Sequence, residues 1–153
     1  MTDLSAQIRG LVEAQAKLDQ TGRDLRGEEM QQNYRTAAML VSTDAKILAP
    51  VDRGGLRASI TPTVRVDGNV IMGVVGSNLD YAPYMETGTR PHWPPLSALA
   101  VWARRHGTTA FVVARAISRR GVRGRHYLQG AFEKNKSEIM RILERGVKGI
   151  VDK

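Results

Sequence analysis

The apolar residues of this chain change their spacing once, on either side of a proline, and this change limits the possible folds more than any other feature. From about Gly27 they recur at helical intervals up to Pro50, which disfavours helical geometry in the residue before it. From Leu56 to Val66 they fall on every second residue, the period of a half-buried strand. A chain that carries both periods in succession is predicted to form a mixed α+β domain.

A tight hairpin is predicted after the first strand. The run Asp67-Gly68-Asn69 supplies residues that tolerate the positive φ of a short turn. Residues 70–76 then return as an antiparallel partner strand. Pro62 lacks the N–H that a strand ladder needs, so its strand is expected at a sheet edge or at a bulge.

Helical spacing recurs in further segments. Residues 4–18 predict an amphipathic helix that Gly22 interrupts or ends, and its apolar stripe consists of Leu4, Ile8, Leu11, Val12 and Leu18. Three more helices are expected at about 96–107, 110–120 and 129–150. The first of these three is expected to bury Leu96, Leu99, Ala100 and Trp102. Residues 81–89 are expected to hold a short strand or an extended loop, and residues 121–125 a flexible basic loop.

The length of 153 residues suits one domain with one core. We predict an N-terminal helical arm over residues 1–25 and a single domain over residues 26–153. In this domain, long helices are expected to pack on an antiparallel hairpin at about 56–76, and the last element is a C-terminal helix.

No apolar run approaches the ~20 residues of a membrane span, and the first residues lack a secretion signal. With no Cys, a disulfide framework is excluded. We therefore expect a soluble protein made in the cytoplasm.

The excess positive charge lies in one segment. Between Thr87 and Phe132 there are eight Arg and no Asp or Glu, and the rest of the chain carries 15 residues of each sign. Guanidinium groups suit bidentate contact with phosphate or carboxylate. The segment therefore indicates nucleic acid or an acidic protein surface as the partner, and a solvated basic face without a dedicated partner is the third alternative.

The sequence contains none of the common catalytic or cofactor-binding motifs. Its three His lie among arginines, whose charge opposes recruitment of a metal ion. Asp52, Asp80 and Glu86 are the candidates for a hydrolase cluster, but turn formation explains Asp52 and Asp80 more simply. We predict no enzyme activity, no cofactor and no metal.

Glu86 is the acid with a proposed structural partner. It precedes Gly88 in a predicted loop, and Arg57 belongs to the predicted hairpin. An ion pair between Glu86 and Arg57 would attach the loop to the hairpin. The alternative is a solvent-facing carboxylate that contributes little.

The helices at 96–107 and 110–120 superficially resemble a helix-turn-helix. Base reading needs polar side chains where a helix enters a groove. The second helix instead begins with an apolar run, Phe111 to Ala114, which indicates packing. Sequence-specific DNA binding is therefore disfavoured, while nonspecific phosphate contact stays open.

Three segments resemble a known family: residues 49–60 (APVDRGGLRASI), residues 81–89 (YAPYMETGT) and residues 124–128 (GRHYL). Arg53 stands where the family usually has Thr, and His126-Tyr127 replaces Pro-Phe. The residues that match the pattern of the first two segments are Pro50, Asp52, Gly54, Leu56, Arg57, Ser59, Tyr81, Glu86, Gly88 and Thr89. The family comprises the head-tail joining or tail-completion proteins of long-tailed bacteriophages, which are minor tail or neck components.

This resemblance implies a structural virion protein, located in the neck or tail and made in the host cytoplasm. Such proteins form a ring, commonly a hexamer, that joins the tail tube to the head connector through which the genome passes. The implied partners are further copies of the chain, the adjoining connector and tail tube or tail terminator proteins, and transiently the DNA, with no membrane. The candidate contact residues are Arg104, Arg105, Arg115, Arg119, Arg120, Arg123 and Arg125. The alternative function is nonspecific nucleic-acid binding by the arginine-rich segment at 90–125.

Overall fold

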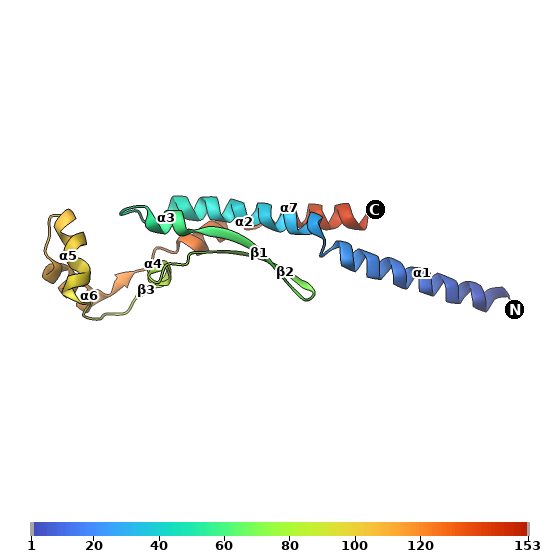
Figure 1. The fold of residues 1–153 in the computed structure, drawn as a ribbon, viewed down its shortest axis with the longest axis horizontal. Coiled ribbons are helices and arrows are strands. Elements are labelled where there is room, and N and C mark those ends of the chain that lie inside the picture. The colour runs from blue at the N-terminus through green and yellow to red at the C-terminus, as the bar shows by residue number, and fades with distance from the viewer. Residues whose placement is uncertain (1, 153) are drawn as a thin grey trace.

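The molecule is elongated, with a central body and a projection at each end (Figure 1). The structure is a computed structural model that describes residues 2–152, and the side chains of residues 13–152. In chain order the elements are α1 (Thr2–Asp24), α2 (Glu28–Leu48), α3 (Gly55–Ser59), β1 (Thr61–Asp67), β2 (Val70–Gly76), α4 (Ala82–Thr87), β3 (Gly88–Thr89), α5 (Leu96–Arg105), α6 (Ala110–Arg120), β4 (Val122–Arg123) and α7 (Tyr127–Val151). This arrangement confirms the predicted mixed α+β fold with long helices.

The body consists of α2 and α7, which pack side by side, and the hairpin β1–β2, which lies on α2. Its core joins residues from α2, α3, α4 and α7. Small residues let the long helices approach closely, since Ala45 and Ala131 are fully buried. The core cluster consists of Val41, Ala45, Ala49, Leu56, Ile60, Ala82, Tyr127 and Ala131.

A polar contact fixes α7 against α2 beside this core. Asp44 of α2 accepts hydrogen bonds from Lys134 Nζ at 2.9 Å and from Asn135 Nδ2. These hydrogen bonds, that from Asn135 first, lower the pKa of the Asp44 carboxyl. Asn135 also donates to the carbonyl of Ala131, so its buried amide is satisfied.

The first strand begins later than predicted. Gly54 adopts a φ of 80°, and the next five residues form the short helix α3 before β1 starts at Thr61. Leu56 and Ile60 are both buried and are four residues apart, which fits a helical turn as well as a strand. The period of two alone therefore placed α3 wrongly in the strand.

The hairpin itself is confirmed. Asp67 pairs with Val70, which leaves Gly68 and Asn69 as a two-residue turn, with Gly68 at a φ of 55°. Pro62 pairs with Val75 in a sheet of two strands, so it lies at an edge as expected.

A second two-stranded sheet joins the segment expected to hold a short strand or an extended loop to the segment expected as a flexible loop. Residues 81–89 form α4 and then β3, and residues 121–125, predicted as a flexible loop, contain β4. Gly88 pairs with Arg123 and Thr89 with Val122. A Cβ at Gly88 would collide with the backbone of β4, and its φ is 82°. This close approach explains the glycine in the sequence.

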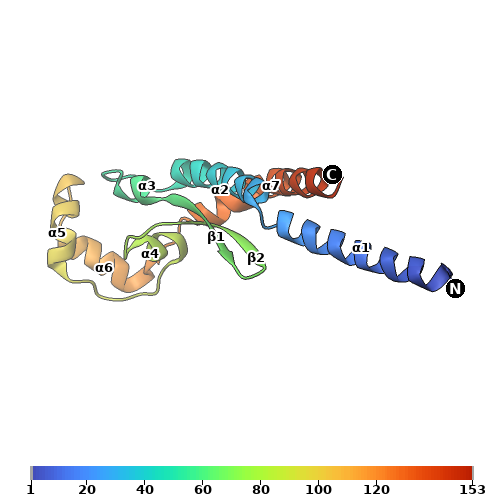
Figure 2. The same cartoon turned by 45° about the vertical axis from the view of Figure 1, so that its right-hand side comes forward.

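Helices α5 and α6 pack on each other at the end of this β3–β4 ribbon and project from the body (Figure 2). We call residues 90–121 the head. The helices agree with the predicted segments, but α5 buries Ala103 and leaves Leu96, Ala100 and Trp102 exposed, contrary to expectation. Two short helices have too little surface to cover all their apolar residues.

At the other end, α1 projects from the N-terminus of α2 (Figures 1 and 2). The predicted stripe of Leu4, Ile8, Leu11 and Val12 lies outside the described side chains. Leu18 is described and is 73% exposed. Gly22 lies within the helix, which ends at Asp24.

Candidate functional site

The three motif segments meet where the head joins the body. Residues of all three line one open cleft of about 620 Å³, together with Trp102 and His106 of the head. The motif residues on its wall are Pro50, Asp52, Gly54, Leu56, Tyr81 and Arg125. The segments that carry the family resemblance therefore form one joint of the molecule.

Glu86 caps α7 at this joint. Its Oε2 accepts a hydrogen bond from the backbone N–H of Leu128 at 2.9 Å, and its Oε1 accepts one from Gln129 at 3.0 Å. The N-cap residue of α7, His126, has a φ of 49° and makes no side-chain cap of its own. A carboxylate at a helix N-terminus satisfies free donors and complements the helix dipole.

The predicted pair between Glu86 and Arg57 does not form. Both carboxylate oxygens of Glu86 bind α7, and no ion pair of the described side chains joins the two residues. Arg57 is exposed on α3. The prediction failed because α7, which is remote in sequence, supplies the donors for both oxygens of Glu86.

Tyr127 is a central residue of the joint, although the sequence analysis named it only as a departure from the family pattern. Its side chain has 0% exposure at the first position of α7. Burial, and then the charge of Glu86, raises the pKa of its phenol. Its hydroxyl lies 3.5 Å from the carbonyl oxygen of Ala82, so it is tied only weakly to α4.

Asp52 links the body to the head. Its carboxylate accepts two hydrogen bonds from Arg105, at 2.9 and 2.7 Å, and His106 Nε2 lies 3.7 Å away. The hydrogen bond from Arg105 lowers the pKa of Asp52. The interpretation of Asp52 as a turn residue is therefore wrong, because a fork-like guanidinium from α5 takes both oxygens.

Loss of this link is expected to loosen the head without unfolding the body. In an Asp52→Asn variant, spin labels at Met39→Cys and Ala100→Cys should give a broader distance distribution than in the parent. The pKa of Asp52 is lower in the folded protein than its ordinary value of 3.8. The stabilisation from the contact with Arg105 is therefore fully present above pH 3.8, and it is lost as the pH falls through the lower pKa of the folded state. Asp67→Asn, at the hairpin tip, is the control. An unchanged distribution in Asp52→Asn would contradict the link.

Two further motif residues make hydrogen bonds at the joint. Ser59 donates to the carbonyl of Leu56 and shares a hydrogen bond of 2.7 Å with Ser77, so it ties α3 to the segment after β2. Thr89 Oγ1 accepts from the N–H of Val122 across the ribbon. Tyr81 is exposed in the cleft beside Gly55. Together these contacts hold the backbone of the joint.

The candidate arginines fall into two groups. Arg105 is engaged by Asp52, as described. The other side chains are exposed and make no hydrogen bond or ion pair within the described part of the chain; they are Arg104, Arg115, Arg119, Arg120, Arg123 and Arg125. Three of them, Arg115, Arg119 and Arg120, line a shallow depression on α6. This surface is therefore available for contact outside the chain.

Apolar side chains are exposed beside these arginines. Phe111 and Val112 are 55% and 57% exposed, so the apolar start of α6 is only partly packed, contrary to the prediction. Phe111 touches Trp93 edge-on, with ring centroids 5.8 Å apart. Aromatic and Arg side chains together are typical of protein interfaces. The missed signal was the large number of apolar residues in two short helices.

Two of the three acids weighed for catalysis make structural contacts. Asp52 binds Arg105, and Glu86 binds the start of α7. Among the described residues no group of His, Asp and Glu is arranged to hold a metal ion. Within the same residues, no helix combines the length and apolar character that a membrane span requires.

Comparison with protein families gives one match. The model of the family described as "Bacteriophage HK97-gp10, putative tail-component" matches residues 12–88. The match includes residues 49–60 and most of 81–89, whereas residues 124–128 lie beyond it. No curated protein and no solved structure gives a significant match. Because the match spans half of the chain, this chain belongs to the HK97-gp10-like family of bacteriophage tail components.

Proposed function

We propose that this tail component is the subunit of a ring, a hexamer, at the head-proximal end of the tail, where it joins the tail tube to the head connector. The observation that carries the proposal is the head, which projects from the body and exposes unpaired arginines among apolar side chains. A surface of this kind serves contacts outside the chain. The joint between the head and the body positions the head so that it projects from the body.

The chemistry of the head favours an acidic protein surface as its main partner. Arg119 lies one helical turn after Arg115, on the same face of α6, and Val112 and Ala116 lie in the same depression. A phosphate backbone needs only the positive charges, whereas a protein partner also buries the apolar groups. We therefore assign the head to an adjoining neck or tail protein, with transient contact to DNA in the channel.

Electron microscopy of particles made without this protein tests the proposal. A joining role predicts full heads without tails beside free tails. Tails of irregular length would instead indicate a terminator. Intact joined particles in its absence would refute a role in the neck.

Charge reversal on α6 tests the head directly. The variant Arg115→Glu with Arg119→Glu is expected to reduce joining of heads and tails at least about thirtyfold, because it places like charges against an acidic surface. The matched control, Arg65→Glu with Arg145→Glu, makes the same change in net charge at exposed positions outside the head. Equal joining by the two variants would contradict the assignment of the head.

Nonspecific nucleic-acid binding is the second candidate, favoured by the unpaired arginines and by the absence of acids between residues 87 and 132. A shift assay with random duplex DNA separates the two. At near-physiological salt, a Kd tighter than about 10⁻⁶ M would be a higher affinity than incidental contact between a basic protein and DNA gives. This result would favour nucleic-acid binding as the function.

A further inference from the structure

An open apolar cleft of about 450 Å³ lies in the body, and it shares no lining residue with the cleft of about 620 Å³ at the joint. Residues of α2, α7 and β2 line it, and Gly73 and Val75 come from the same face of β2. Its residues are Tyr34, Ala37, Ala38, Val41, Gly73, Val75, Leu128, Gln129, Phe132, Ile139 and Leu143. Phe132 remains 47% exposed in this cleft. Such a surface is the kind of groove into which an amphipathic helix lays its apolar face.

Helix α1 is an amphipathic helix with little of its own chain to pack on. Residues 13–20 are all exposed, and α1 makes only sparse contact with α2 and α7. Most of the stability of a helix in a protein comes from packing of its apolar face. Leu18, the described member of the predicted stripe, lacks this packing within its own molecule.

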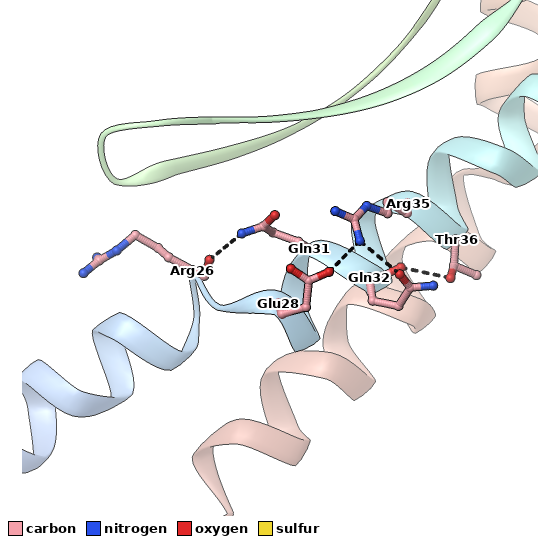
Figure 3. A network of polar contacts seen from close by, with 6 residues as sticks. All are labelled: Arg26, Glu28, Gln31, Gln32, Arg35 and Thr36. Atoms are coloured by element: carbon pink, nitrogen blue, oxygen red, sulfur yellow. Dashed lines mark hydrogen bonds and ion pairs between the residues drawn. The ribbon is translucent and has the colours of Figure 1, made fainter.

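Hydrogen bonds fix the turn between α1 and the start of α2 (Figure 3). Gln31 Nε2 donates to the carbonyl of Arg26 at 3.0 Å, and the N–H of Gly27 donates to the carbonyl of Asp24 at 2.9 Å. Arg35 reaches back to Glu28 at 2.6 Å. In both views of the whole molecule α1 continues outward from the body (Figures 1 and 2). Docking of α1 therefore requires a second molecule.

We infer that α1 of one copy lies in the α2–β2–α7 cleft of the neighbouring copy. In the sequence, the stripe from Leu4 to Leu18 spans about 21 Å of helix, and the part of α7 that lines the cleft, Leu128 to Leu143, spans about 22 Å. The two surfaces therefore match in apolar character and in length. This contact rests on the proposed ring, because a donor and an acceptor at different places on one chain make a head-to-tail contact that repeats until it closes.

Cross-linking between two single-cysteine variants tests this contact, since the chain has no cysteine of its own. Leu18→Cys is mixed with Phe132→Cys, or separately with Leu143→Cys, assembled, and treated with a short thiol cross-linker. The expected result is a covalent dimer in at least one mixture, and the mixture that reacts gives the direction of α1. Gln20→Cys, about 200° further around the helix, is the matched control and should react far less. No dimer, or equal reaction of the control, overturns the inference.

A substitution provides the second measurement. Leu18→Lys is expected to weaken association of the copies about tenfold or more, because a charge replaces an apolar anchor. Gln20→Lys adds the same charge and should leave association unchanged. Helix content by circular dichroism verifies that both variants fold. Rings that form equally from both variants overturn the α1 contact and leave the proposed function standing, whereas the absence of rings in particles and in solution refutes both.

Discussion

Replacement of Tyr127 by alanine is expected to lower the free energy of unfolding by about 3–5 kcal/mol. The ring has 0% exposure and belongs to the core cluster that joins α2, α3, α4 and α7. Its removal leaves a cavity at the start of α7, where neighbouring backbone is tied by hydrogen bonds and cannot collapse freely. Urea unfolding followed by circular dichroism gives the value.

Two controls separate ring packing from other effects at Tyr127. Tyr127→Phe keeps the ring and is expected to cost less than about 1 kcal/mol, because the hydroxyl is 3.5 Å from its acceptor. Tyr84→Ala, at an exposed tyrosine of α4, should change stability by less than about 0.5 kcal/mol. A Phe variant as unstable as the Ala variant would show that the hydroxyl, not the ring, carries the effect.

The raised pKa of Tyr127 adds a dependence on pH. Burial favours the neutral phenol, so the pKa in the folded state lies above the ordinary value of 10.0. The contribution of the phenol to stability is fully present below pH 10.0 and declines as the pH rises through the higher pKa of the folded state. The parent should therefore lose more stability than Tyr127→Phe in this alkaline range.

Replacement of Glu86 by alanine is expected to lower the free energy of unfolding by roughly 2–3 kcal/mol. The change removes both acceptors of the Leu128 and Gln129 N–H groups and the negative charge at the N-terminus of α7. Glu86→Gln keeps one acceptor and should lose about half as much. Denaturant unfolding gives the values, and the amide resonances of Leu128 and Gln129 should shift in both variants.

Further variants distinguish this cap from an ordinary surface acid and from the ion pair expected at first. Glu133→Ala, at an exposed acid of α7, should have little effect. Reversal of both charges at Glu86 and Arg57 should not rescue reversal of Glu86 alone. Rescue by that double variant would support the ion pair between Glu86 and Arg57 and contradict the role of Glu86 as the cap of α7.

The motif residues gain a common explanation from their positions. Leu56 belongs to the core, Gly88 allows β3 to approach β4, and Glu86 caps α7. Asp52 couples this frame to the head through Arg105. The family resemblance therefore lies in the joint that positions the head, while the surface that we propose for a partner lies on the head.

The sequence by itself determined the local structure and the family. The helical stripe of α2, its end before Pro50, and the turn at Gly68 depend on residues within a few positions of one another, and these were predicted. The motif at residues 49–60 was recognisable for the same reason, since its turn and helix residues are contiguous. Where a short apolar spacing fitted two periods, as from Leu56 to Ile60, local pattern did not decide between helix and strand.

Only the tertiary structure decided which distant groups meet. Glu86 binds an amide 42 residues away, and Asp52 binds a guanidinium 53 residues away. The pairing of β3 with β4 and the burial of Tyr127 likewise depend on where α7 packs. The physical reason is that a carboxylate or a strand edge satisfies itself with whichever donor the packed chain brings within about 3 Å, and that choice belongs to the arrangement of the helices, not to the local order of residues.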